Sequence, residues 1–358
     1  MRAVLAAGGT GGHMFPAQAL SEELVRLGWQ CAMITDARGR KHAGRIQADP
    51  IIEVKAATLS PRQPIKALRG AIELGRGVRQ ARAFMRDWKP DVVVGFGGYP
   101  SFPALRAAQS MNIPRLIHEQ NAVLGRVNRV FARKAVAVAS GFDDLAKLPE
   151  GANHVVVGNP LRDTLLSAAG EKSDKTRERI HLLVVGGSLG ANILSERVPA
   201  AVAALPDGLR AHIDVVQQAT ESRIEAAGRT YAEAGVPAFL DTFFTDIETH
   251  LAKADLIIAR AGASSVSEIA LMGKPSILVP LAIAMDDHQM ENARALERLG
   301  AARVVPESEF TVERLTSILA EILNDTDWLD RAGANASKLA RPEAARDLAA
   351  LVISAAGP

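Results

Sequence analysis

The chain has very little cysteine, and it lacks the long apolar runs of membrane-spanning helices. Cys31 is the only cysteine among 358 residues, so no disulfide can form within the chain. Because no secretory signature is present either, a reducing cytoplasm is the expected compartment. No apolar run approaches the roughly 20 residues that span a bilayer. We therefore expect neither a disulfide-stabilised secreted protein nor an integral membrane protein.

Aromatic residues are also scarce, at 4% of the chain, whereas hydrophobic residues reach 48% and glycines number 29. This composition is typical of an α/β protein packed with small aliphatic side chains around glycine turns. The length exceeds that of an ordinary domain, so two lobes are expected.

Short apolar runs alternate with amphipathic segments in both halves, which is the pattern of a parallel sheet with crossover helices. The predicted strands cover residues 3–7, 30–35, 92–96, 115–118 and 136–139, and then 181–185, 213–217, 256–259, 276–280 and 303–306. Each half is therefore predicted to form one Rossmann-like, doubly wound unit.

The boundary between the halves is expected at VVVGNPLR, residues 155–162, whose Gly-Asn-Pro favours a turn. The predicted domains are residues 1–160 and 161–341. The helix expected over 342–358 is compatible with packing on either lobe, including back on the first. The polar stretch 170–179 is interpreted as an exposed loop.

Four predicted strands run into small or glycine-rich turns that open a helix. Their sequences are GGTGGH at 8–13, GFGGYPS at 95–101, GGSLGA at 186–191 and RAGASSVSE at 260–268. Such turns direct backbone N–H groups and the positive helix end at an anion, of which phosphate is the expected one. One turn alone would be explained equally well by tight strand-to-helix packing, but four turns over two lobes favour phosphate binding.

No dinucleotide fingerprint is present, because a G-x-G motif that starts at Gly9 would need its last glycine where Met14 stands. Asp36, however, ends the second predicted strand, where a dehydrogenase binds ribose. A dehydrogenase that uses NAD would explain this aspartate and one glycine turn, but not the turns of the second half.

The turn at 260–268 has separate candidate groups for binding a diphosphate and a ribose. Ala263, Ser264 and Ser265 present consecutive amides and hydroxyls for a diphosphate, and Glu268 is placed to accept hydrogen bonds from a ribose diol. The alternative is a capping box, in which Ser264 or Ser265 is the N-cap and Glu268 completes it. The sequence alone leaves both interpretations open.

Two further groups are candidates for acid–base or polar roles. His13 stands at the start of a predicted helix, whose dipole favours the neutral, base-competent imidazole, although a capping or packing role is the commoner one for a histidine there. Glu119 and Asn121, within HEQN, follow a strand at the edge where α/β ligands bind. No His and Cys cluster has zinc spacing, and we expect no metal or cofactor.

Charge is divided unevenly between the halves. Residues 1–160 hold 22 Lys and Arg against 12 Asp and Glu, whereas residues 161–358 hold 20 against 28. Basic side chains recur at helical spacing at positions Arg62, Lys66, Arg69, Arg76, Arg79, Arg82, Arg86 and Lys89, with Ile65, Leu68, Ile72, Phe84, Met85 and Trp88 among them. A second basic group comprises Arg126, Arg129, Arg133 and Lys134. The basic half is compatible with binding to nucleic acid or to an anionic membrane surface, or with an accidental surface bias. The helical pattern itself is compatible with an anionic lipid surface or with a solvated helix face whose apolar residues meet the core.

Taken together and in order, GGTGGHMFPA, GFGGYPSFPALRAA, HEQN, VVGNPLR, GGSLGA and RAGASSVSEIALMGKPSILVP followed by DDHQMENA resemble the MurG family of N-acetylglucosaminyltransferases over nearly the whole chain. The resemblance implies the GT-B fold, with two Rossmann-like domains that face a cleft. It also implies inverting transfer of N-acetylglucosamine from UDP-N-acetylglucosamine to the 4-hydroxyl of the muramoyl sugar of lipid I, which gives lipid II in peptidoglycan synthesis.

The implied setting is peripheral, on the anionic cytoplasmic face of the inner membrane, with cell-wall synthesis and division proteins as partners and no nucleic acid. His13 is implied as the catalytic base, with Glu119 as its rival and Tyr99 also near the acceptor. The implied contacts of the donor are Thr10, Gly11, Gly12 and Asn121 in the first lobe, Arg162 at the junction, and Ser188, Phe244 through its backbone to uracil, Ala263, Ser264, Ser265, Val266, Ser267, Glu268 and Gln289 in the second.

The sequence departs from the family pattern at three places. His288 stands where some relatives have a second glutamine, Gln217 and Gln218 stand where relatives often show His-Gln, and Phe244 replaces a smaller apolar residue. Two rival functions stay open beside the dehydrogenase: a UDP-sugar 2-epimerase, which needs no basic membrane face, and a non-catalytic membrane-surface module.

Overall fold

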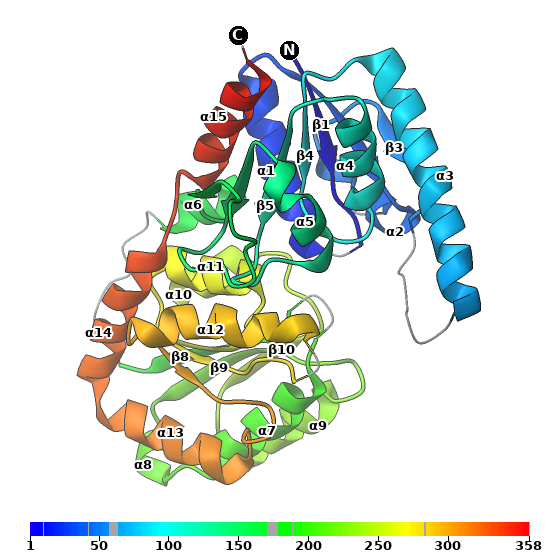
Figure 1. The fold of residues 1–358 in the computed structure, drawn as a ribbon. Helices are drawn as coiled ribbons and strands as arrows, with labels where there is room; N and C mark the ends of the chain where they lie inside the picture. The colour runs from blue at the N-terminus through cyan, green and yellow to red at the C-terminus, as the bar shows by residue number, and fades with distance from the viewer. Residues whose placement is uncertain are drawn as a thin grey trace. The chain divides into compact units, whose positions relative to one another are not determined.

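The computed structural model describes residues 1–9, 11–41, 43–56, 64–169, 178–187, 190–282 and 284–357. The chain forms two compact units, Met1–Arg162 with Arg341–Pro358 and Asp163–Ala340 (Figure 1). Within the described ranges, no helix combines the length and the apolar character needed to cross a membrane.

The first unit is built on a parallel sheet with strand order β3-β2-β1-β4-β5-β6-β7. Its strands are β1 (Arg2–Ala6), β2 (Gln30–Thr35), β3 (Ile51–Glu53), β4 (Val92–Gly95), β5 (Arg115–Glu119), β6 (Ala137–Ser140) and β7 (His154–Val156). Its α-helices are α1 (Gly11–Arg26), α2 (Ala37–Arg40), α3 (Pro64–Trp88), α4 (Ser101–Ser110), α5 (Arg126–Phe131) and α15 (Ala344–Ala356), and short 3-10 turns cover η1 (Ala43–Arg45) and η2 (Ala132–Lys134).

Helices cover both faces of this sheet, which is why its central strands are continuous apolar runs. One core joins the sheet to α1 and α15, with Leu20, Leu24, Leu348 and Val352 all fully buried. The two helices lie side by side in Figure 1, so the C-terminal helix completes the first unit. A second core joins the other face of the sheet to α3, α4 and α5.

The second unit is built on a parallel sheet with strand order β10-β9-β8-β11-β12-β13. Its strands are β8 (Ile180–Val185), β9 (Ile213–Gln218), β10 (Ala238–Asp241), β11 (Leu256–Ala259), β12 (Ser276–Leu278) and β13 (Ala302–Val304). Its α-helices are α6 (Asp163–Ala169), α7 (Asn192–Ala203), α8 (Asp207–Arg210), α9 (Ile224–Glu233), α10 (Ile247–Lys253), α11 (Ala263–Leu271), α12 (His288–Arg298), α13 (Val312–Asn324) and α14 (Thr326–Ala336), with 3-10 turns η3 (Met285–Asp287) and η4 (Ser337–Leu339).

The prediction of two doubly wound parallel sheets is confirmed. Three strands were not predicted: β3, β7 and β10. All three lie at sheet edges, and none of their residues is fully buried. Each contains only a short apolar run, such as Ile51–Ile52 in β3 and Val155–Val156 in β7, which is too short to mark a strand by its pattern alone.

The strand order explains where the four turns lie. In each sheet the order in which successive strands are added reverses beside the first strand. This switch lies between β1 and β4 in one unit and between β8 and β11 in the other. Ligands of doubly wound sheets bind beyond the carboxyl ends of the strands at such a switch point. The turns at 8–13 and 95–101 follow β1 and β4, and those at 186–191 and 260–268 follow β8 and β11. Both units therefore place two of the predicted phosphate-binding turns at the switch point.

Candidate active site

The first glycine turn is held by Asp36, which caps α2. Its Oδ1 atom accepts hydrogen bonds from the backbone N–H groups of Gly9 at 3.1 Å and Gly39 at 2.9 Å. A Cβ on Gly8 would lie 2.7 Å from this same oxygen, so only glycine fits. Asp36 is thus occupied in shaping the turn, which removes the main support for a ribose-binding aspartate of a dehydrogenase.

His13 is the third residue of α1 and lies against the second glycine turn. An ideal Cβ on Gly97 would stand 3.4 Å from His13 Nε2, and one on Gly98 would stand 3.7 Å from its Cε1. Both glycines have positive φ values, +86° and +70°, which L side chains rarely adopt. The predicted position of His13 at the helix start is confirmed, and the second turn forms one wall beside its ring.

Glu119 ends β5 with only 3% of its surface exposed. Its Oε1 accepts from the backbone N–H and the Nδ2 of Asn121, both at 3.1 Å. Its Oε2 accepts from Gly125 N and Asn128 Nδ2, both at 2.8 Å. Four donors on one buried carboxylate make Glu119 the organiser of the loop over residues 121–128.

The same loop reaches the wall beside His13, because Asn128 Nδ2 lies 3.1 Å from the ideal Cβ of Gly97. The first unit therefore brings together His13, Gly97, Asn128 and Glu119. Asn128 was not predicted, and nothing in its local sequence distinguishes it. Gly11 and Gly12 open α1 and Tyr99 is half-buried in the second turn, while Thr10 lies outside the described residues.

His118 precedes Glu119 on β5 and points to the opposite face, as successive strand residues do. It is fully buried: Nε2 donates to Gly158 O at 3.0 Å, and Nδ1 accepts from Gln120 Nε2 at 3.0 Å. Asn159 Nδ2 in turn donates to Gln120 O. These bonds fix the turn that leads to Arg162, whose guanidinium lies 5.5 Å from the ring centroid of Phe15.

Burial lowers the pKa of His118 from 6.5 to about 4, although its bond to Gly158 opposes the shift. The imidazole therefore stays neutral in the folded chain under conditions that protonate it in the unfolded chain. Its contribution to stability is complete above pH 6.5 and is lost as the pH falls from 6.5 towards 4. We expect the free energy of unfolding to decrease by roughly 3 kcal/mol over this interval.

Urea unfolding of the wild type and of His118→Gln at pH 7, 5.5 and 4.5 measures this effect. Because glutamine does not titrate, the stability difference between the two proteins should shrink as the pH falls. A difference that stays constant with pH would show that His118 is not held neutral by burial.

In the second unit, α11 begins with an open end. Gly262 is the N-cap and supplies no side-chain cap, and the first intrahelical bond runs from Val266 N to Gly262 O. The N–H groups of Ala263, Ser264 and Ser265 therefore point out of the helix end, where the dipole is positive. The alternative of an N-cap at Ser264 or Ser265 is wrong. Both lie inside the first turn of the helix.

The side chains of this first turn are already oriented. Ser264 Oγ donates to Glu268 Oε1 at 2.8 Å, one helical turn further on. Glu268 and Ser267 are half-buried, and Val266 is fully buried in the core. Within the predicted run over residues 263–268, the polar side chains therefore lie near the open end of the helix, whereas Val266 packs into the core.

Three contacts fix the turn before α11. Arg260 Nη1 donates to Val279 O at 3.1 Å and pairs with Glu307 Oε2 at 2.8 Å. Asn292 Nδ2, fully buried, donates to Ala261 O at 3.1 Å. Since both partners of the Arg260 pair are largely buried, the pair holds β11 firmly to the loops after β12 and β13. A rigid helix start costs no reorganisation when it binds an anion.

Other predicted donor residues lie on neighbouring loops of the same unit. Gln289, in the first turn of α12, accepts from Leu281 N at 2.9 Å and so fixes the loop after β12, and His288 is the first residue of that helix. Phe244 is 8% exposed, with its ring centroid 4.7 Å from that of His250. Ser188 lies outside the described residues. No group of three or more potential metal ligands occurs in the described part of the chain.

The chain matches two models of known families. Residues 3–140 match the glycosyltransferase family 28 N-terminal domain, and residues 181–357 match the glycosyltransferase family 28 C-terminal domain. The solved structure of MurG from Acinetobacter baumannii is similar, with 31% identity, 98% coverage of each chain and a TM-score of 0.81.

Two curated relatives carry the name UDP-N-acetylglucosamine--N-acetylmuramyl-(pentapeptide) pyrophosphoryl-undecaprenol N-acetylglucosamine transferase. The protein from Maricaulis maris is 50% identical over 98% of this chain and 96% of its own, and that from Caulobacter vibrioides is 44% identical over 98% of both. The chain therefore belongs to glycosyltransferase family 28 and, within it, to the MurG family of N-acetylglucosamine transferases.

Proposed function

We propose that this chain transfers N-acetylglucosamine from UDP-N-acetylglucosamine to the 4-hydroxyl of the muramoyl sugar of lipid I, which gives lipid II. The names and the 50% and 44% identities of the relatives support the substrates. The observation that carries the proposal is the open start of α11 at the switch point of the second unit. It is a site for the diphosphate of a nucleotide sugar.

On the donor side, the amides of Ala263, Ser264 and Ser265 bind the diphosphate, and the helix dipole stabilises the charge that develops on departing UDP. Glu268, which the hydrogen bond from Ser264 Oγ to its Oε1 atom holds in place, binds the ribose diol. Gln289 binds sugar hydroxyls, and the backbone of Phe244 binds uracil. The second unit thus contacts every part of the donor.

On the acceptor side, His13 removes the proton of the attacking hydroxyl. The oxygen forms a bond to the anomeric carbon while the bond from that carbon to the diphosphate breaks, and its electron pair leaves with UDP. A single displacement inverts the anomeric configuration. His13 is favoured over Glu119 because all four contacts of the Glu119 carboxylate support the protein's own loop.

The test is UDP release measured with and without lipid I. We expect release only when lipid I is present, with one N-acetylglucosamine incorporated into lipid II for each UDP. A UDP-sugar 2-epimerase would convert the donor without any acceptor. Turnover of the donor that is independent of lipid I would contradict the proposal.

We also propose that α3 rests on an anionic membrane surface at the cytoplasmic face. Two large apolar residues on this helix are exposed, Leu68 at 66% and Ile72 at 49%. Figure 1 shows the first turns of α3 standing clear of the other elements of their unit. Exposed basic side chains accompany them at Arg69, Arg76, Arg79, Arg82, Arg86 and Lys89.

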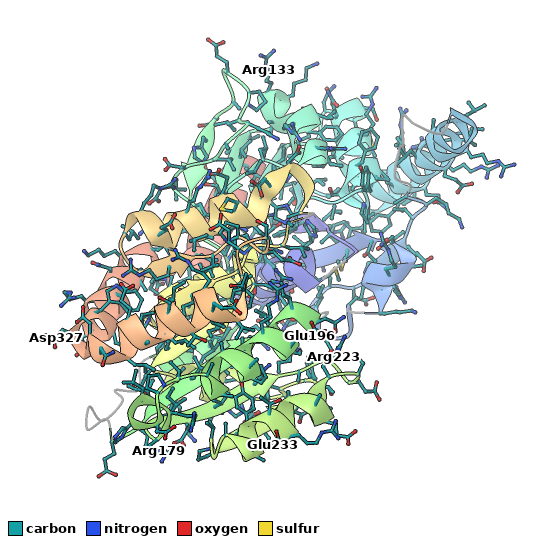
Figure 2. All side chains as sticks on the ribbon, turned by 90° about the horizontal axis from the view of Figure 1, so that it is seen from below. Arg133, Arg179, Glu196, Arg223, Glu233 and Asp327 are labelled. Atoms are coloured by element: carbon teal, nitrogen blue, oxygen red, sulfur yellow. The ribbon has the colours of Figure 1, made fainter. Side chains whose placement is uncertain are left out.

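The last turns of α3 fit the other interpretation of its pattern, in which the apolar residues of a solvated helix meet the core. Met85 is buried, and Phe84 and Trp88 pack against the core. Arg62, together with the side chains of Ile65 and Lys66, lies outside the described part. Three members of the second basic group are also exposed on this unit, namely Arg126, Arg133 and Lys134. Arg133 is labelled in Figure 2. Contacts with cell-wall synthesis and division proteins stay predictions from the resemblance.

We expect the double variant Leu68→Ser, Ile72→Ser to lose at least tenfold in binding to vesicles that contain phosphatidylglycerol, because two apolar side chains no longer enter the interface. Co-sedimentation measures the binding. Leu27→Ser, which removes an exposed apolar residue outside α3, is the matched control and should bind as the wild type does. Unchanged binding of the double variant would place the lipid contact elsewhere, and an equal loss in Leu27→Ser would show that the effect is not specific to α3.

A further inference from the structure

Gln218 is the last residue of β9, and its side chain bridges two loops. The ladder between β8 and β9 ends at Val184 and Gln217. One step further on, Gln218 Oε1 accepts from Gly186 N at 3.1 Å, and Gln218 Nε2 donates to Thr242 O at 3.1 Å. The side-chain amide therefore continues the hydrogen bonding between β8 and β9 one step beyond the end of their ladder, while β9 and β10 still pair at Gln218 and Asp241. It is 6% exposed.

The preceding glutamine has a different role, because its side chain points to the other face of the sheet. Gln217 is fully buried: its Oε1 accepts from Tyr231 OH at 2.5 Å, and its Nε2 donates to Leu194 O at 3.3 Å. These contacts join β9 to helices α7 and α9. Gln217 thus belongs to the scaffold, whereas Gln218 faces the loops at the carboxyl end of the sheet.

The two loops that Gln218 joins follow β8 and β10, which are not neighbours in the sheet because β9 lies between them. Gly186 opens the turn after β8, where a Cβ would lie 2.5 Å from Ala191 N, so this backbone is closely packed. Thr242 opens the loop after β10 that carries Phe244, and its N–H donates to Asp241 Oδ1 at 2.6 Å. One loop lies at the switch point and the other carries the proposed uracil contact.

We propose that Gln218 is a positioning residue that fixes the spacing between the phosphate-side turn and the base-side loop. It thereby matches the second unit to the length of a nucleoside diphosphate. The inference rests on the proposed function, since it assumes that both loops contact one donor. An amide is suited to this role because it accepts on one side and donates on the other, which neither a carboxylate nor an apolar side chain does.

The test compares Gln218→Met, which removes both hydrogen bonds at similar volume, with Gln217→Met. For Gln218→Met we expect KM for UDP-N-acetylglucosamine to rise about tenfold, while kcat changes less than threefold and KM for lipid I stays constant. The inhibition constant of UDP should rise about tenfold and that of uridine less than twofold, because uridine needs only the base-side loop.

Gln217→Met should lower the melting temperature and leave the ratio of the UDP and uridine inhibition constants unchanged. If Gln218→Met does not fold, Gln218→Glu decides by the same ratio, since it keeps the acceptor for Gly186 and loses the donor to Thr242. An unchanged ratio in a folded Gln218 variant, or an equal change in Gln217→Met, would overturn the inference. If the wild type itself fails to transfer the sugar to lipid I, the proposed function is what fails.

Discussion

Replacing His13 by Ala should lower kcat for the transfer by about a hundredfold or more, because the attacking hydroxyl loses the group that takes its proton. The fold should survive, since His13 is only half-buried and stands at the start of α1. Single-turnover measurement with saturating UDP-N-acetylglucosamine and lipid I isolates the chemical step. Near-normal turnover would remove His13 from the role of base.

Two controls separate a base from a residue that only packs. Added imidazole should restore part of the activity of His13→Ala, because a free imidazole can occupy the space left beside Gly97 and Gly98. His13→Gln, which fills that space without a basic nitrogen, should stay as slow as His13→Ala. Recovery of activity in the glutamine variant would indicate a packing role.

Replacing Glu119 by Gln should destabilise the first unit rather than remove a base. An amide has only one accepting oxygen, so its NH2 group would face two of the four donors that now point at the carboxylate. We expect the free energy of unfolding to fall by roughly 2–4 kcal/mol. Urea unfolding measures this loss.

Activity should fall with stability, because the loop over 121–128 forms part of the wall beside His13. Glu150→Gln, at an exposed glutamate, is the matched control and should change neither stability nor turnover. If Glu119→Gln were as stable as the wild type but inactive, Glu119 would be the better candidate for the base.

The features that the sequence predicted are those with local causes. Central strands are continuous apolar runs because both faces of each sheet are covered, and the turns at their ends need glycine at positions such as Gly8 and Gly97. The βαβ pattern predicts parallel strands, whereas the order of the strands, and hence the two switch points, comes from the structure. His13 at the start of α1 belongs to this local group.

What could not be predicted depends on partners distant in sequence. Asp36 reaches Gly9 across 27 positions and Gln218 reaches Gly186 across 32, because strand pairing brings their ends together. The pattern of α3 did not separate exposed Leu68 from buried Met85, since both recur at helical spacing. The donors on Glu119 are close in sequence, but no regular spacing marks Asn121, Gly125 and Asn128, so they are recognised only in the folded loop after β5.

Ion pairs on the exposed surface have little influence on the site. Figure 2 labels Glu196 and Arg223, which pair at 2.6 Å on the second unit while both remain substantially exposed. Such a pair contributes little to stability in water. The largely buried Arg260–Glu307 pair differs, because it fixes the turn before α11, the proposed diphosphate site.

Calorimetric titration of the chain with UDP-N-acetylglucosamine, beside Ser264→Ala and a parallel titration with NAD, tests the nucleotide site of the second unit most directly. We predict one site for the sugar nucleotide, weaker binding when the Ser264 hydroxyl is removed, and no heat from NAD. Binding of NAD, or the absence of binding by UDP-N-acetylglucosamine, would contradict the assignment of α11 as the diphosphate site.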